Sequence, residues 1–78
     1  MEIENLIQLV NEHMRDEGSI GFPQIVSQLP EKMDPQRSDI PGIETEWLWQ
    51  SMDQFDNYHG EIAFELQNGR WLMFEFYG

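Results

Sequence analysis

Cysteine is missing from this chain of 78 residues, and basic residues are scarce. Without cysteine, neither a disulfide nor a thiolate metal site can stabilise the fold. Apolar packing must do so, with a dimer interface as a further source of buried surface. A domain of this size buries only about 60% of the surface that its unfolded chain exposes. We therefore expect a single domain over residues 1–78 with little stability to spare.

Long apolar segments are also missing. No basic stretch followed by an apolar one stands near the N-terminus, so no signal peptide is predicted. No apolar run approaches the roughly 20 residues that span a bilayer. These absences predict a cytoplasmic protein that does not enter a membrane.

The sequence motifs of common enzymes are missing as well. There is no glycine-rich phosphate loop, and no serine has the glycine context of a nucleophile elbow. His13 stands alone beside the apolar stripe of a predicted helix. Asp53, Asp56, His59 and Glu61 resemble a metal site in residue type, but their spacing matches no calcium loop and is typical of a solvated polar turn. We expect no enzymatic activity, no cofactor and no metal.

Acidic residues are what the chain has in excess. Fifteen aspartates and glutamates face four lysines and arginines, which gives a net charge of −11. The imbalance is greater in the second half, where Arg70 is the only basic residue after position 38. Such a charge repels nucleic acids and anionic membranes and attracts basic proteins. The simpler interpretation, that the acidity only keeps the protein in solution, stays open.

Residues 2–17 carry an apolar stripe at helical spacing. Its members recur at i, i+3, i+4, i+7 and i+11 and are Ile3, Leu6, Ile7, Val10 and Met14. Gly18 is placed to end this helix. A short second helix is expected over residues 19–29, because Pro23 suits a first helical position and Pro30 disfavours a helical residue before it.

Two segments that follow are harder to assign. Residues 30–42 combine three prolines and a glycine with charged residues and are predicted to be an irregular connection. Residues 44–56 fit either a helix, by the spacing of their apolar residues, or a strand, by the Trp-Leu-Trp cluster at 47–49. The strand is preferred, because a hairpin gains stability from a third strand. Residues 56–60 would then form the connecting turn.

Residues 60–77 show the clearest strand pattern, with two apolar runs on either side of Gln67–Gly69. A two-residue Asn-Gly turn would pair Gln67 with Arg70 and divide the apolar side chains between two faces. A three-residue loop, with its glycine left-handed, pairs Leu66 with Arg70 and gathers the apolar side chains on one face. That face would hold Ile62, Phe64, Leu66, Leu72, Phe74 and Phe76. Since a small core needs one apolar face, we prefer the three-residue loop.

Together these assignments predict an α+β fold. An N-terminal amphipathic helix and a short second helix would pack on a small antiparallel sheet. The sheet would contain the C-terminal hairpin 60–77 and, with a third strand, form a three-stranded meander over 45–77. The single domain would then have a helical part at 2–29, an irregular proline-rich connection at 30–42 and a β part at 44–77.

The second face of the hairpin carries acidic and aromatic side chains. In the preferred register Glu61 lies opposite Glu75, Glu65 lies opposite Trp71, and Tyr77 continues the row. Like charges directly opposite each other destabilise a sheet, although carboxylates at strand ends can simply be solvated. Acids around an exposed aromatic ring suit an arginine, through ion pairing and cation–π contact. This face is therefore a candidate site for a cationic partner.

A third strand would enlarge the negative surface and add tryptophans to it, unless the tryptophans serve core or dimer packing. The predicted partner-binding residues are Glu44, Glu46, Asp53, Asp56, Glu61, Glu65, Trp71, Glu75 and Tyr77. Alternate residues of a strand lie about 6.6 Å apart. Two phosphate steps along a DNA strand, at about 3.4 Å each, give a similar spacing. A row of strand carboxylates can therefore imitate a row of phosphates.

In overall character the chain is short, acidic, rich in aromatics and free of cysteine. It resembles the small inhibitors encoded by phages and mobile elements, among them DNA-mimic anti-restriction proteins and anti-CRISPR proteins. It is also similar to immunity proteins that neutralise basic nuclease toxins. The resemblance is compositional and implies a function without assigning a residue to it.

Three hypotheses follow for the function. The first is an acidic inhibitor that occludes the basic surface of a nucleic-acid-handling enzyme or complex, without binding nucleic acid or membrane itself. The second is an immunity protein for one basic toxin. The third is a housekeeping oligomerisation or adaptor domain, in which the tryptophans form a homodimer interface and the acidity confers solubility alone.

Overall fold

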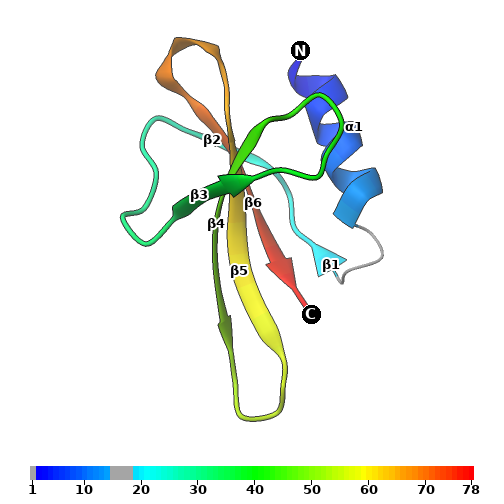
Figure 1. Ribbon diagram of the computed structural model, residues 1–78, viewed down its shortest axis with the longest axis vertical. Helices are drawn as coiled ribbons and strands as arrows, with labels where there is room; N and C mark the ends of the chain where they lie inside the picture. Colours follow the sequence, from blue (N-terminus) through cyan, green and yellow to red (C-terminus); the bar gives the residue numbers. More distant parts are fainter. Residues whose placement is uncertain (1, 15–18) are drawn as a thin grey trace.

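The computed structural model describes residues 2–14 and 19–78. The described chain forms one α-helix and one antiparallel sheet of six strands (Figure 1). The elements, in chain order, are α1 (Ile3–Met14), β1 (Ser19–Ile20), β2 (Gln24–Val26), β3 (Asp34–Arg37), β4 (Thr45–Met52), β5 (Tyr58–Glu65), the short 3₁₀ helix η2 (Gln67–Gly69) and β6 (Trp71–Tyr77). The strand order is β1-β6-β5-β4-β3, and β2 pairs with the same edge of β6 as β1 does. Consecutive long strands are therefore neighbours in a meander.

The predicted second helix over 19–29 is wrong, and the predicted three-stranded sheet is too small. Residues 19–26 form the edge strands β1 and β2, in which Ile20 pairs with Phe76 and Ile25 with Leu72. Between them, three residues, Gly21–Pro23, stand opposite two residues of β6, as in a β-bulge. Proline is tolerated there, because a bulge in an edge strand does not need its missing N–H. The short apolar pattern of this segment fits a strand as well as a helix.

The predicted irregular connection over 30–42 also needs correction, because it contains β3. Asp34 pairs with Leu48 and Arg37 with Thr45. Pro35 sits in this strand at the outer edge of the sheet, where proline is allowed. The high proportion of proline indicated a loop, but an edge strand can accommodate the same prolines.

Other predictions are confirmed. The helix forms with Leu6, Val10 and Met14 on its buried face, while the predicted helix end at 15–18 lies outside the described residues. The segment after residue 44 is a strand, as preferred, but the connecting turn lies at 53–57 rather than 56–60, because β5 begins at Tyr58.

The C-terminal hairpin has the preferred three-residue loop. The N–H of Leu66 donates to the carbonyl of Arg70 at 2.7 Å, and Gly69 is left-handed with φ 70°.

The core lies between α1 and one face of the sheet, which we call the helix side. Phe64, Phe74, Leu72 and Val10 are its largest fully buried side chains. Ile40, from the loop before β4, closes the cluster. Burying one such side chain stabilises the fold by about 1.5–3 kcal/mol, so these few residues supply much of the apolar stabilisation.

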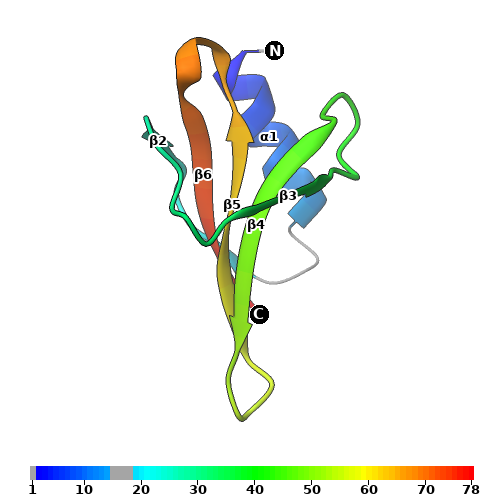
Figure 2. The same ribbon diagram turned by 60° about the vertical axis from the view of Figure 1, so that its left-hand side comes forward.

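The opposite face of the sheet is crossed by the segment 27–33, which runs from β2 at one edge to β3 at the other (Figure 2). Met33 and Ala63 are buried there, although neither belongs to the helix-side core. Trp47 and Trp71 meet edge to face on this side, with ring centres 4.5 Å apart. The part of the sheet beneath α1 and the crossing segment is thus covered on both faces, and we call it the covered half.

Beyond the covered half, the β4–β5 hairpin projects from the body of the molecule (Figures 1 and 2). We call residues 49–61 of this hairpin, with residues 75–77 of β6, the open end. The projection makes the molecule elongated, with extents of 39 × 27 × 22 Å. In the described part of the chain, no helix has the length and apolar character needed to cross a membrane.

Candidate partner-binding site

Two glutamates face each other on the open end. Glu61 of β5 pairs with Glu75 of β6 in the predicted register, which brings their Cβ atoms to about 5 Å. Each carboxylate has a neutral donor: Nε1 of Trp49 donates to Oε1 of Glu61 at 2.8 Å, and the hydroxyl of Tyr77 donates to Oε2 of Glu75 at 2.7 Å. Because each charge is held by a donor of its own, the repulsive pair is compatible with the sheet.

The neighbouring carboxylates change the pKa of Tyr77. Its hydrogen bond to Glu75, and then the charge of that same carboxylate, raise the pKa of the tyrosine, with smaller contributions from desolvation and from Glu61. The phenol therefore stays protonated and keeps donating to Glu75 well above neutral pH.

Trp49 lies where the open end meets the covered half and already contacts a cation. The ammonium Nζ of Lys32 stands 3.6 Å from the centre of the indole ring. His59 meets the same ring edge to face, with centres 5.6 Å apart. The tryptophan thus joins a cation, an imidazole and the carboxylate of Glu61. An aromatic ring beside a carboxylate thus holds a cation within the protein itself. The sequence suggested the same combination as a site for a partner's arginine.

The tip of the β4–β5 hairpin is ordered by its first aspartate. Oδ1 of Asp53 accepts from the backbone N–H groups of Phe55 at 2.8 Å and Asn57 at 3.1 Å. Asp56 is left-handed with φ 65°. This tight turn leaves Phe55 74% exposed and Met52 64% exposed, so two large apolar side chains stand in solvent beside two carboxylates.

The structure brings together part of the predicted set. Asp53, Asp56, Glu61, Glu75 and Tyr77 all belong to the open end. The other four are located elsewhere.

Of those four, Trp71 is half-buried against Trp47, and Glu65 lies exposed opposite it in the covered half. Glu44 is exposed in the loop before β4. Glu46 is only 8% exposed and faces the helix side, where Nε2 of Gln36 donates to it at 2.8 Å. The alternation of β4 places Glu46 on the face opposite Trp47, so Glu46 cannot widen the surface of Glu61 and Glu75.

Sequence reasoning missed Lys32, Met52 and Phe55 as members of this surface. Lys32 reaches Trp49 only because the segment 27–33 crosses the sheet, and no local pattern announces such a crossing. Met52 and Phe55 could have been found from the sequence, since each directly precedes an aspartate at or within the turn.

Comparison of the chain with protein-family models, curated proteins and solved structures gave no match. Among the described residues, no group of three or more histidine and carboxylate side chains is arranged to hold a metal ion.

Proposed function

We propose that the protein binds, through its open end, a basic and nucleic-acid-binding surface of a partner protein and thereby occludes it. The observation that carries the proposal is the composition of that end. Its residues include four carboxylates, those of Asp53, Asp56, Glu61 and Glu75, and no lysine or arginine. The cation above Trp49 comes from another segment.

Charge and apolar contact would have separate roles in this binding. Uncompensated carboxylates on a projecting hairpin accelerate the encounter with a basic surface and make it sensitive to salt. Exposed aromatic and methionine side chains are the residues that anchor protein interfaces once water is excluded. Phe55 and Met52 are placed for that role, since they are the apolar side chains at the tip.

The charge part of the proposal can be tested with two variants of equal net charge. The first carries Asp56→Asn, Glu61→Gln and Glu75→Gln at the open end. The control carries Glu4→Gln, Glu12→Gln and Glu31→Gln, which are exposed carboxylates elsewhere. Binding to a panel of basic nucleic-acid-handling proteins is measured for both at low and high salt.

We expect the open-end variant to bind about ten- to a hundredfold more weakly, because three interfacial pairs at roughly 0.5–1 kcal/mol each are removed. The control variant should bind almost as the unmodified protein does. Equal weakening in both variants would show that net charge, rather than this surface, governs binding. Affinity that does not change with salt would overturn the electrostatic mechanism.

The apolar part is tested by Phe55→Ala. Because Phe55 is exposed in the free protein, its truncation should leave folding unchanged and raise the dissociation rate of the complex. Unchanged dissociation would remove the tip from the interface.

A further inference from the structure

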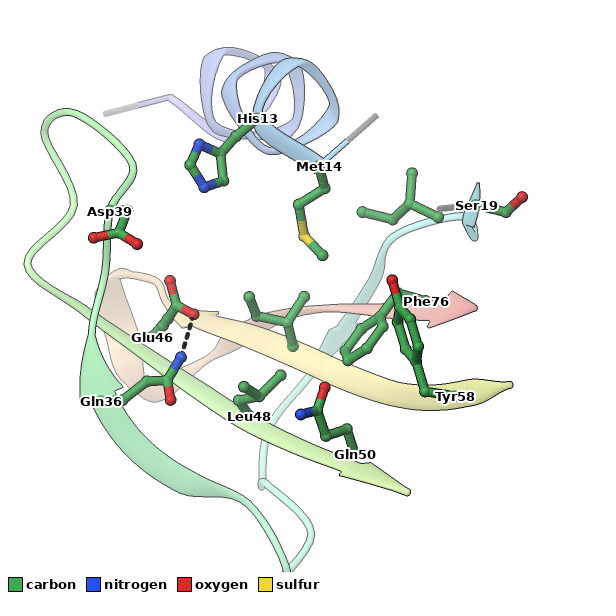
Figure 3. A pocket seen from close by; sticks show the side chains of 12 residues that line it. His13, Met14, Ser19, Gln36, Asp39, Glu46, Leu48, Gln50, Tyr58 and Phe76 are labelled. Carbon is green, nitrogen blue, oxygen red and sulfur yellow. Dashed lines mark hydrogen bonds between the residues drawn. The ribbon is translucent and has the colours of Figure 1, made fainter. Parts of the chain in front are cut away.

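A cavity of about 230 Å³ opens on the helix side of the sheet, the face opposite to Glu61 and Glu75. It lies between the end of α1, the loop before β4, and strands β3 and β4 (Figure 3). Leu48, Ile62 and Phe76 give it apolar walls. Sites for drug-sized ligands enclose roughly 300–1,000 Å³, so this cavity suits a single side chain or a molecule of that size.

Glu46 is the buried charge of the cavity. Its side chain is 8% exposed, and one carboxylate oxygen accepts from Nε2 of Gln36 at 2.8 Å. The other oxygen points into the cavity in Figure 3, and no side chain among the described residues donates to it. Among the described residues no buried side-chain oxygen lacks a hydrogen-bond partner, so this second oxygen is open to the cavity. A cation in the cavity can reach it and add a charge-assisted hydrogen bond to the one from the neutral amide.

The mouth of the cavity adds a second acid. Asp39 lines it from the loop before β4, on the same side as Glu46, and His13 reaches toward it from α1 (Figure 3). Two carboxylates at the polar side and apolar walls opposite them match a group that is cationic at its end and apolar along its stem.

We propose that this cavity binds a guanidinium group carried on a short apolar stem. A guanidinium presents five donors in one plane, so it can bond the free oxygen of Glu46 and the carboxylate of Asp39 together. An ammonium is a compact, strongly hydrated point charge and fits a partly apolar cavity less well. The inference does not depend on the proposed function, because Glu46 and the Glu61–Glu75 pair lie on opposite faces of the sheet.

The test is a nuclear magnetic resonance titration of the full chain with two blocked amino acids of the same shape. N-acetyl-argininamide carries the guanidinium, and N-acetyl-citrullinamide replaces it with a neutral urea. We expect saturable shifts around Leu48 and Gln50 with the arginine compound and none with the citrulline compound. Equal responses to both compounds would overturn the proposal.

Variants locate the binding. Glu46→Gln should weaken the arginine compound at least tenfold, whereas the matched control Glu65→Gln, an exposed carboxylate on the other face, should leave its affinity unchanged. Should Glu46→Gln disturb the fold, Asp39→Asn serves instead, since Asp39 is exposed, and a severalfold loss is expected. Unchanged affinity in a folded Glu46→Gln or Asp39→Asn variant would exclude the cavity as the site.

The guanidinium could belong to a free small molecule or to the arginine side chain of another protein. Butylguanidinium represents the first source, and a blocked Gly-Arg-Gly peptide represents the second. If both bind, the cavity admits a side chain from a partner; if only butylguanidinium binds, it takes a free molecule. If neither binds, the proposal fails. These titrations contain no partner protein, so their failure leaves the proposed function standing, and the salt experiment can fail without affecting them.

Discussion

The covered half and the open end are built from the same strands, yet the strand residues of the core, with the exception of Phe76, lie in the first. Ala63 and Glu61 lie on one face of β5, two residues apart. Ala63 is fully buried beneath the crossing segment, whereas Glu61 is half-buried and keeps its charge near solvent. The difference shows that alternation along a strand determines which face a side chain lies on, while coverage by distant segments determines which part of that face is buried and which part stays exposed.

The sharpest way to test this division is to truncate one phenylalanine in each part. Phe74 is fully buried in the covered half, and Phe55 is 74% exposed at the tip. Phe74→Ala should lower the free energy of unfolding by about 3–5 kcal/mol, which is a large share of the roughly 4–12 kcal/mol expected for a chain of this length. Phe55→Ala should change it by less than about 0.5 kcal/mol.

Urea denaturation followed by tryptophan fluorescence measures both variants. A large loss of unfolding free energy for Phe55→Ala would show that the open end is packed in solution. The distinction between the two parts would then be wrong.

The boundary between the two parts is marked by a glycine. A Cβ on Gly60 would lie 2.7 Å from the ring of Phe76 and would also collide with the carbonyl oxygen of Trp49. Gly60→Ala should therefore destabilise the protein by about 1–3 kcal/mol through overpacking. Gly21→Ala is the matched control, because its Cβ would meet its nearest atom at an ordinary 3.5 Å. Similar thermal midpoints for the two variants would contradict the close approach.

The two hairpin loops extend the comparison to the ends of the sheet. Each loop holds three residues inside a closing backbone hydrogen bond, from Asp53 to Asn57 at the open end and from Leu66 to Arg70 at the opposite end of the sheet. The third residue is left-handed in both loops, Asp56 with φ 65° and Gly69 with φ 70°. Gly69→Ala should cost about 1 kcal/mol, because nothing lies within 4 Å of the added Cβ and only the backbone conformation opposes it. Asp56→Gly should stay within about 0.5 kcal/mol, since relieved strain is offset by greater freedom of the unfolded chain.

Chemical denaturation of the two variants measures both changes in the free energy of unfolding. If Asp56→Gly is as costly as Gly69→Ala, the left-handed backbone is not the shared cause.

The open end also shows how far local patterns could predict the structure. The register that sets Glu61 against Glu75 followed from requiring one apolar face, and the Asn-Gly loop supported it. The mistaken helix over 19–29 and the missed strand β3 arose where apolar residues were few and prolines many. Edge strands pair with only one neighbouring strand, and their sequences show only a weak alternation of apolar and polar residues.

The site was predictable only in part for a related reason. The alternation of β5 and β6 placed Glu61, Glu75 and Tyr77 together, because these residues belong to one hairpin. Lys32 was beyond reach, since its position depends on the crossing segment. The alternation of β4 could have placed Glu46 on the other face, but its hydrogen bond with Gln36 depends on the pairing of β4 with β3. Contacts between segments far apart in the sequence are set by tertiary packing, which local periodicity does not contain.

The smallest expected effect belongs to Tyr77, whose hydroxyl is held by Glu75. Because the folded-state pKa of this tyrosine is raised, its contribution to stability is complete below the ordinary pKa near 10 and is lost as the pH rises through the raised value. Glu75→Gln should bring the pKa of Tyr77 back toward its ordinary value, because the largest causes of the increase are removed. Titration of the tyrosine ring carbon by nuclear magnetic resonance measures this, with Glu65→Gln as control. If both variants titrate Tyr77 alike, the hydrogen bond to Glu75 does not hold in solution, and the open end would present its carboxylates without this donor.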